Sequence, residues 1–211
     1  MPADPFTTGV PRPATIIGHR SPEFSVQAVV DGKISTISSL DLLGKYVLLF
    51  FYPNDFSFIC PTEMHALQDS LHEFKKRRVE VIAASVDSIQ THMAWLTRPR
   101  ERGGIEGITF SIVSDFKKEL ARAYCILDEQ AGVCLRGVFL LDRDSIVQYG
   151  AVNNLNVGRN VGELLRVADA VQFTEKHGEL CPMDWTPGTR TVSPTHEGKI
   201  RYYGPAASPA R

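Results

Sequence analysis

An apolar run from Tyr46 to Tyr52 that stops at Pro53 constrains the fold more than any other segment. Its core, Val47 to Phe51, predicts a β-strand buried on both faces. A helix is predicted over residues 62–78 and a second strand over residues 79–86, because apolar residues repeat at helical spacing at Met64, Leu67, Leu71 and Phe74. A strand, helix, strand order implies a right-handed parallel crossover, typical of an α/β fold. Functional residues are expected beyond the carboxyl end of the first strand.

Cys60 lies at that position, just before the predicted helix, and Pro61 suits the first helical residue. A free thiol has a pKa of about 8.5 and is only a few per cent ionised near pH 7. Lowering a thiol pKa by about 2 units takes roughly 2.7 kcal/mol, whereas a helix dipole supplies about 0.3–1 and at most about 2. Glu63, one turn along the same face, would oppose a thiolate. A reactive Cys60 therefore needs a nearby cation; the alternative is an inert core cysteine.

Residues 53–60 read Pro-Asn-Asp-Phe-Ser-Phe-Ile-Cys, preceded by Phe-Phe-Tyr and followed by Pro-Thr-Glu. In this motif the chain resembles the peroxiredoxins, specifically the typical two-cysteine group that includes the peroxidase component of bacterial alkyl hydroperoxide reductase. The resemblance covers most of the chain and continues, in the family's order, at residues 84–88, 94–96, 112–115, 136–139, 157–160 and 178–182.

The resemblance assigns a role to each matching residue. Cys60 is expected to be the peroxidatic cysteine, and Pro53 to shield it from water. Ser57 stands where threonine is commoner and would hydrogen-bond both the peroxide and the thiolate. Arg136 matches the active-site arginine and would be the required cation, although an arginine taken alone is more often a solvated surface charge. The supporting network is expected to consist of Glu63 and Arg159.

Four cysteines, Cys60, Cys125, Cys134 and Cys181, contain no Cys-x-x-Cys pair, and their spacing does not favour a metal site. By the resemblance, Cys181 in Gly-Glu-Leu-Cys-Pro is the resolving cysteine, which attacks the oxidised Cys60 of a partner subunit. This implies a homodimer, and in this family dimers commonly assemble into a decamer. Cys125 and Cys134 match no family role, and we expect both to be small apolar fillers.

The implied activity is reduction of hydrogen peroxide and alkyl hydroperoxides through a sulfenic acid at Cys60. No flavin or nicotinamide motif is present, so no cofactor is expected and an external dithiol must close the cycle, either a thioredoxin-like protein or a dedicated flavoprotein reductase. A different class of function stays open, a redox-triggered holdase chaperone or structural ring. A thioredoxin-type reductase is disfavoured, because Glu63 stands where its second cysteine would be.

The expected fold is thioredoxin-like, an α/β architecture with a central mixed sheet flanked by helices and a C-terminal arm. Its predicted parts are a mobile segment over residues 1–15, the peroxidase domain over 16–178, and the arm with the resolving cysteine over 179–211. A net charge of −1, with 43% hydrophobic and 22% charged residues, suggests neither nucleic-acid nor membrane binding. The N-terminal residues lack the pattern of a signal peptide, so we expect the cytoplasm.

Further elements follow from local signals: a helix over residues 89–97, another capped by Asp115, and a hairpin of residues 138–141 with 146–152. Asn160 is expected to cap a helix that ends near Gly178. Three aromatic residues are expected in the core, namely Trp95, Phe110 and Phe116.

Two segments depart from the family pattern that makes some members sensitive to overoxidation. Residues 103–106 read Gly-Gly-Ile-Glu rather than Gly-Gly-Leu-Gly, and Tyr202-Tyr203 replaces a Tyr-Phe pair. We therefore expect an intermediate response to excess peroxide.

Overall fold

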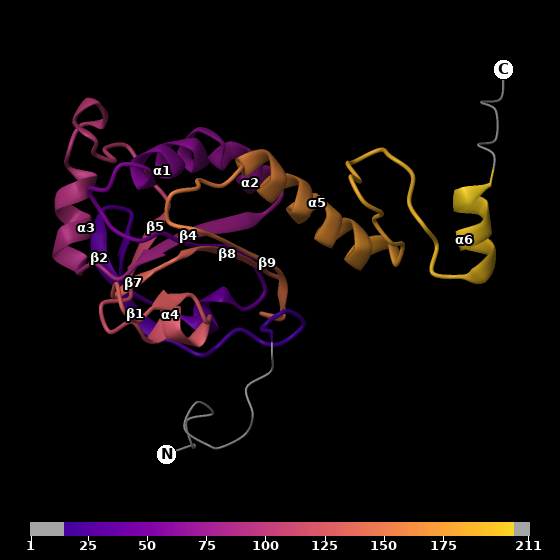
Figure 1. Cartoon of the computed structure of the whole chain (residues 1–211), viewed down its shortest axis with the longest axis horizontal. Helices are drawn as coiled ribbons and strands as arrows, with labels where there is room; N and C mark the ends of the chain where they lie inside the picture. The colour runs from indigo at the N-terminus through magenta and orange to yellow at the C-terminus, as the bar shows by residue number, and fades with distance from the viewer. Residues whose placement is uncertain (1–14, 205–211) are drawn as a thin grey trace, which may run out of the picture. The chain divides into compact units, whose positions relative to one another are not determined.

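A computed structural model describes residues 15–204, which divide into two compact units between Arg159 and Asn160 (Figure 1). Apart from Thr15, the expected mobile N-terminal segment lies outside the described residues. The expected domain boundary at residues 178 and 179 stays a prediction.

A mixed seven-stranded sheet forms the centre of the first unit, in the order β2-β1-β5-β4-β3-β8-β9. Strand β3 is parallel to β4, and β4 is parallel to β5, whereas β8 is antiparallel to β3. The predicted crossover and the predicted hairpin of β8 with β9 are thus both present. The strands are β1 Ser25–Val30, β2 Lys33–Ser38, β3 Tyr46–Phe51, β4 Val79–Ser85, β5 Ser111–Ser114, β8 Arg136–Leu141 and β9 Val147–Asn153.

Helices cover both faces of this sheet (Figure 1), with α1 and α2 on one side and α4 on the other. The helices of the first unit are α1 Cys60–Asp69, α2 Leu71–Lys76, α3 Ile89–Leu96 and α4 Glu119–Ala123, with 3-10 turns η1 Ser39–Leu42 and η2 Arg100–Arg102. A two-stranded ribbon, β6 Leu127–Asp128 and β7 Val133–Cys134, follows α4.

Strand β3 is buried along both faces, as its sequence predicts. Alternate residues of a strand point to opposite faces. Val47, Leu49 and Phe51 accordingly belong to one core cluster with Leu120 and Ala121 of α4. The loop that leads to Cys60 begins at the carboxyl end of β3, and Tyr52, its first residue, is still fully buried.

The predicted helix over residues 62–78 is two helices, so that prediction was wrong in detail. It starts earlier, at Cys60, and is interrupted at Ser70, whose backbone (φ −98°, ψ 3°) ends α1 and precedes α2. The Ser70 backbone N–H bonds to the carbonyls of Ala66 and Gln68, and its side chain makes no capping hydrogen bond to α2, so the break is a feature of the backbone. Leu67 and Leu71 are both buried, so the apolar face continues across the break.

Two predictions around α4 also need correction. Lys118 (φ 62°) is the N-cap, and the carboxylate of Asp115 reaches past it to accept hydrogen bonds from the N–H groups of Leu120 and Ala121, at 3.0 and 2.7 Å. Phe116 is 66% exposed and is no core residue. The other two aromatic residues expected in the core, Trp95 and Phe110, are buried.

The second unit contains α5 (Val161–His177) and α6 (His196–Tyr203). Asn160 Oδ1 accepts a hydrogen bond from the N–H of Glu163, and Gly178 ends α5 at φ 67°, as predicted. Cys181 lies after the end of α5 and before α6.

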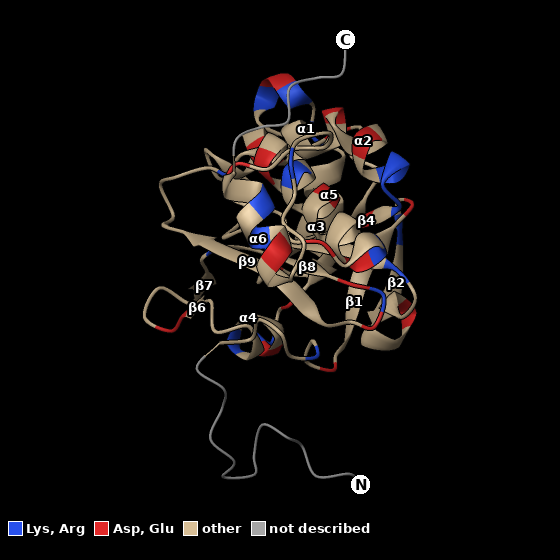
Figure 2. Cartoon of the chain, turned by 90° about the vertical axis from the view of Figure 1, so that its right-hand side faces the viewer, with Lys and Arg blue, Asp and Glu red and all other residues tan. Residues whose placement is uncertain are grey.

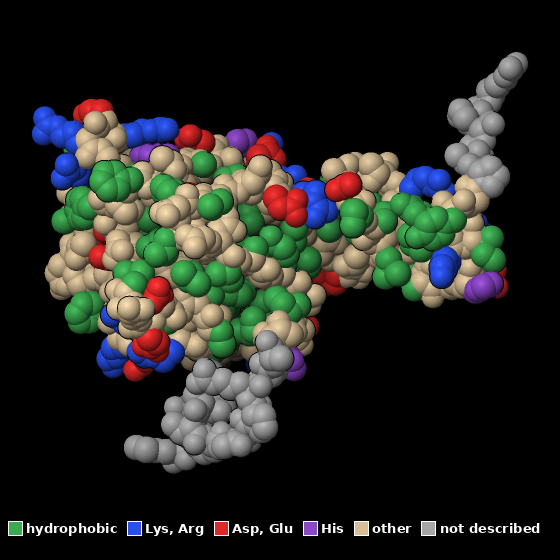
Figure 3. All heavy atoms as spheres, in the orientation of Figure 1, with side chains coloured by type: hydrophobic (Ala, Val, Ile, Leu, Met, Phe, Trp, Pro, Cys, Tyr) green, Lys and Arg blue, Asp and Glu red, His purple; other side chains and the backbone are tan. Residues whose placement is uncertain are grey.

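Acidic and basic residues are interspersed along the chain (Figure 2). Apolar side chains are scattered among polar ones on the face seen in Figure 3. None of the helices within residues 15–204 has both the length and the apolar character needed to cross a membrane.

Candidate active site

The loop of residues 52–59, which we call the cysteine loop, carries the chain from the end of β3 to Cys60, the first residue of α1. No side chain caps this helix; instead Thr62 donates hydrogen bonds to the carbonyl of Ile59 from its N–H (2.9 Å) and its hydroxyl (2.6 Å). The Cys60 thiol is fully buried and lies at the positive end of α1.

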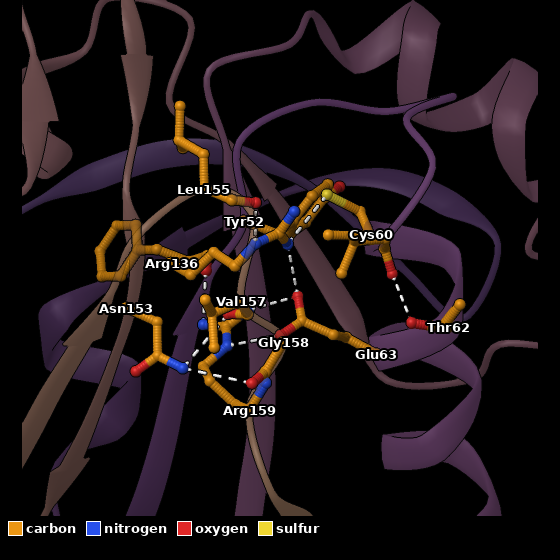
Figure 4. Close-up of polar contacts among 12 residues, drawn as sticks. Tyr52, Cys60, Thr62, Glu63, Arg136, Asn153, Leu155, Val157, Gly158 and Arg159 are labelled. Atoms are coloured by element: carbon orange, nitrogen blue, oxygen red, sulfur yellow. Dashed lines mark hydrogen bonds and ion pairs between the residues drawn. The ribbon is translucent and has the colours of Figure 1, made fainter.

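Arg136, the first residue of β8, points toward Cys60 (Figure 4). Its Nη1 donates a hydrogen bond to Cys60 Sγ at 3.4 Å and another to Glu63 Oε2 at 2.7 Å. Its Nε donates to the carbonyl of Leu155 at 2.7 Å, which fixes the orientation of the guanidinium. Arg136 is only 3% exposed, so this is a buried cation and no solvated surface charge.

Arg159 holds Glu63 from the other side (Figure 4). Its backbone N–H and Nε donate to Glu63 Oε1, and its Nη2 donates to Oε2, all at 2.9 Å. Its Nη1 donates to the carbonyls of Phe51 and Gly137, each at 2.6 Å, and its guanidinium lies 3.2 Å from the centroid of the Phe50 ring. Burial lowers the pKa of Arg159 while Glu63 opposes that shift, and a guanidinium stays charged at any physiological pH.

The charges of this cluster do not cancel. One carboxylate, Glu63, pairs with two guanidiniums, and the three side chains are each about 4% exposed. One positive charge is therefore left in a poorly solvated site beside the Cys60 sulfur. This surplus positive charge offsets the charge of the carboxylate that the sequence places next to the sulfur.

Ser57 brings a hydroxyl to the cysteine loop, and Pro53 is buried in it. The Ser57 Oγ is buried and finds no hydrogen-bond partner among the described residues. A buried hydroxyl without a partner costs free energy, and most such groups in proteins are satisfied by something. The Ser57 hydroxyl thus has hydrogen-bonding capacity that the described residues do not use.

Cys181 belongs to the second unit, where it is partly buried and its Sγ lies 3.8 Å from the carbonyl of Ala170. Burial raises the pKa of its thiol, and Arg166 moderates the shift. Within residues 15–204 the four cysteines are free.

The two cysteines without an expected role differ from one another. Cys134 is fully buried in the core cluster, as a small apolar filler should be, and its Sγ donates to the carbonyl of Tyr52 at 2.9 Å. Cys125 is exposed, with a positive φ of 56°, so the expectation that it fills the core was wrong. A left-handed backbone directly after α4 turns this residue outward. The described residues contain no group of three side chains placed to hold a metal ion.

Sequence reasoning missed the groups that hold the two arginines. They are the carbonyls of Phe51, Gly137 and Leu155 and the ring of Phe50. A backbone carbonyl leaves no mark in the sequence, because every residue has one. The sequence indicates only that Phe50 belongs to a strand, and it gives no sign that its ring contacts Arg159.

Comparisons with known proteins agree on the family. The AhpC/TSA family model matches residues 17–150, and the model described as the C-terminal domain of 1-Cys peroxiredoxin matches residues 170–204. Peroxiredoxin prdx-2 of Caenorhabditis elegans is 44% identical over 89% of this chain and 93% of its own. The mitochondrial thioredoxin-dependent peroxide reductase of Mus musculus is 42% identical over 94% of this chain and 77% of its own.

A crystal structure of the reduced 2-Cys peroxiredoxin of Plasmodium vivax matches with a TM-score of 0.87 and 41% identity, covering 89% of this chain and 98% of that one. At this identity and coverage the likeness extends to sequence as well as fold. The chain therefore belongs to the AhpC/TSA family and is a peroxiredoxin, a peroxidase of the oxidoreductase class with a thioredoxin-like fold.

Proposed function

We propose that this chain reduces hydrogen peroxide and alkyl hydroperoxides with Cys60 as the attacking thiolate. The observation that carries the proposal is the 3.4 Å contact of Arg136 Nη1 with Cys60 Sγ, in a cluster that keeps one positive charge in excess. This arrangement stabilises both the thiolate and the negative charge that develops on a departing oxygen.

In the first step the Cys60 thiolate attacks the terminal oxygen of the hydroperoxide. An S–O bond forms, the O–O bond breaks, and the remaining oxygen leaves as alkoxide or hydroxide, which takes up a proton. The sulfur is oxidised to a sulfenic acid and the peroxide is reduced to an alcohol or water. Ser57 and Arg136 orient the peroxide, and buried Pro53 keeps water away from the sulfur.

In the second step Cys181 of a partner subunit condenses with the sulfenic acid, which forms a disulfide and releases water. Cys60 is fully buried, so the residues around it must move before another thiol can reach its sulfur. The proposal of two participating cysteines is supported by the similarity to the 2-Cys peroxiredoxin of Plasmodium vivax.

An external dithiol then reduces the disulfide. Relatives named thioredoxin peroxidase, in Echinococcus granulosus, and thioredoxin-dependent peroxide reductase, in mouse, favour a thioredoxin-like protein over a flavoprotein as that reductant. We propose a homodimer that assembles to a decamer, and the cytoplasm as its compartment. Sedimentation of the reduced chain tests the assembly, and cell fractionation tests the compartment.

Non-reducing electrophoresis after one equivalent of peroxide tests the couple. The wild-type chain should form a dimer-sized band that dithiothreitol removes, whereas Cys181→Ser should consume that equivalent and stay monomer-sized. Cys125→Ser, which removes an exposed thiol, is the matched control and should behave as wild type. A dimer band that persists in Cys181→Ser but disappears in Cys125→Ser would overturn the proposed couple.

The holdase alternative is tested with Cys60→Ser. If this variant loses peroxide turnover and suppresses client aggregation as well as wild type does, the two activities are separate. A wild-type chain that never consumes peroxide would contradict the proposed enzyme.

A further inference from the structure

A second buried polar cluster lies beneath the cysteine loop and takes no part in the chemistry described above. Asp55, inside the loop, accepts a hydrogen bond from the hydroxyl of Tyr52 on Oδ1 at 2.7 Å. Its Oδ2 lies 2.7 Å from Nδ1 of His92 on α3. The side chains of Asp55 and His92 are both 0% exposed, and Tyr52 is also 0% exposed.

The hydrogen bonds of His92 determine its protons. Its Nε2 lies 3.2 Å from the carbonyl of Val113 on β5, and since a carbonyl only accepts, Nε2 carries a hydrogen. In a neutral imidazole Nδ1 then carries a lone pair and no hydrogen. Such a nitrogen cannot lie 2.7 Å from an oxygen of an ionised Asp55, because neither atom has a hydrogen to donate. One proton is therefore held between His92 and Asp55, as imidazolium with carboxylate or as neutral imidazole with carboxylic acid.

The same cluster ties the cysteine loop to neighbouring elements. The backbone N–H of Asp55 donates to Asp87 Oδ2 at 2.9 Å, and the hydroxyl of Ser85 donates to the same oxygen at 2.7 Å. Burial raises the pKa of Asp55, an effect that its hydrogen bond with His92 opposes and that the charge of Asp87 adds to. Burial together with Asp55 raises the pKa of Tyr52 well above its usual range, so the phenol stays a donor.

The next loop residue, Phe56, contacts the same helix as Asp55. Its ring is 5.9 Å from that of Trp95, centroid to centroid, and the Arg98 guanidinium lies 5.7 Å from its centroid. Phe56 has a φ of 55°, a conformation that residues other than glycine rarely adopt. His92 and Trp95 are three residues apart on α3, so one helix face holds two successive loop residues.

We propose that Asp55 and His92 are positioning residues that latch the cysteine loop closed, and that the latch holds only while the two side chains share one proton. The inference rests on the proposed function in one respect, namely that the loop must open for Cys181 to reach the Cys60 sulfur. The closed loop is the form that keeps Ser57 and Cys60 in place for the peroxide, and release of the proton favours the open form.

The direction of the pH dependence follows from the proton balance. In the open loop Asp55 and His92 are solvated, with ordinary pKa values of about 3.9 and 6.5. Above about pH 6.5 the open pair therefore carries no shared proton, whereas the closed pair carries one. Opening then releases one proton and becomes about tenfold more favourable for each unit of rising pH, until the closed pair itself loses its proton. Between about pH 5 and 6 both forms hold one proton, and opening is insensitive to pH.

The substitution Asp55→Asn removes the need for a shared proton and keeps the packing of the cluster. An asparagine can accept from Tyr52 through its oxygen and donate to Nδ1 of a neutral His92 through its amide. The variant keeps the shape and the hydrogen bonds of the cluster but needs no shared proton. Its loop should stay latched at every pH above about 6.5, where His92 is neutral in both the closed and the open form. Asp31→Asn is the matched control, since it removes a carboxylate from an exposed turn of the same unit.

Amide hydrogen exchange of residues 54–60 in the reduced full-length chain tests the latch without any turnover. After correction for the chemical exchange rate, the opening equilibrium of wild type and Asp31→Asn should rise about tenfold per pH unit above pH 6.5. In Asp55→Asn it should change less than about twofold from pH 6.5 to 8.5. All titratable groups other than Asp55 are the same in wild type and Asp55→Asn, so equal slopes in these two proteins would overturn the proposal.

Ring-nitrogen NMR of wild type is the second measurement and applies even if the variant fails to fold. The His92 signals should stay constant through about pH 6.5, the ordinary pKa of a solvated histidine. A His92 ring whose signals change with a midpoint near that pH would contradict the shared proton. If peroxide turnover failed while both measurements agreed with the latch, the proposed function would be wrong and the latch would stand.

Discussion

Cys60 and Cys134 have the same side chain and are both 0% exposed, yet their hydrogen-bond partners differ. Cys60 begins a helix and accepts a hydrogen bond from Arg136 in a cluster with surplus positive charge. Cys134 lies in the apolar core cluster and donates to the carbonyl of Tyr52. Burial raises the pKa of the Cys134 thiol far above its usual range.

Burial alone therefore says nothing about whether a cysteine reacts. Removal from water disfavours any thiolate, and only fixed positive charge at short range can reverse that preference. The protein provides this charge with two arginines around one glutamate on the Cys60 side of the sheet. Cys134 packs in the core cluster of aliphatic and aromatic residues, where burial, followed by the charge of Asp115, raises its pKa by more than Arg159 lowers it. This thiol acts as a small apolar residue with one hydrogen bond.

The largest expected effect is the loss of peroxidase activity in Cys60→Ser. Removal of the attacking group should lower the second-order rate constant for peroxide roughly 10⁴–10⁶-fold, as loss of an enzyme nucleophile does. Cys134→Ser, which keeps the donor to Tyr52, should change that rate less than about threefold. Stopped-flow consumption of peroxide by the reduced chains measures both. A large fall of the rate constant in a folded Cys134→Ser variant would contradict the view that Cys134 is only a core residue.

Arg136→Met should lower the rate constant about 10²–10³-fold, because it removes the cation that stabilises both the thiolate and the leaving oxygen. Arg122→Met is the matched control, since Arg122 pairs with Glu129 in an exposed salt bridge. Such surface pairs contribute about 0–1 kcal/mol to stability, so the control should behave as wild type. The pH profile of alkylation of Cys60 by iodoacetamide adds a second measure. Unchanged alkylation in Arg136→Met would show that the surplus charge is not what activates the sulfur.

Ser57→Ala should lower the same rate constant about tenfold, which corresponds to a hydrogen bond to a charged or developing-charge group of about 1.5 kcal/mol. Ser57→Thr restores the hydroxyl and should keep most of the activity. The unfolding free energy of Ser57→Ala should be unchanged or higher, because the buried Oγ has no partner among the described residues. Equal rates in the alanine and threonine variants would exclude the hydroxyl from peroxide binding.

The smallest expected effect concerns stability at alkaline pH. The Cys134 pKa is raised in the folded state, so its contribution is fully present below the unfolded pKa of about 8.5 and is lost as the pH rises further. The unfolding free energy should fall by about 1.4 kcal/mol per pH unit more steeply in wild type than in Cys134→Ser. Urea unfolding at about pH 7.5 and about pH 9.5, on either side of that unfolded pKa, measures this difference. Equal slopes in the two proteins would show that Cys134 does not titrate on unfolding.

Much of the first unit could be predicted from local signals, and the exceptions share a cause. Apolar runs and the turn and proline signals around them predict β3, β4 and α3 to within one or two residues, because these signals are local in the sequence. The break at Ser70 and the exposure of Cys125 and Phe116 have no such signal. Each depends on the backbone conformation of one or two residues, which the surrounding structure selects.

The candidate site divides in the same way. The motif around Cys60 identifies the sulfur, and the conflict with Glu63 already requires a cation, because both follow from residues adjacent in the chain. The arrangement of two guanidiniums on that one carboxylate, and the three carbonyls that aim them, were decided only by the tertiary structure. Arg136 and Arg159 lie 73 and 96 residues from Glu63, and only a sheet that brings the start of β8 and the chain after β9 beside the carboxyl end of β3 can place them there.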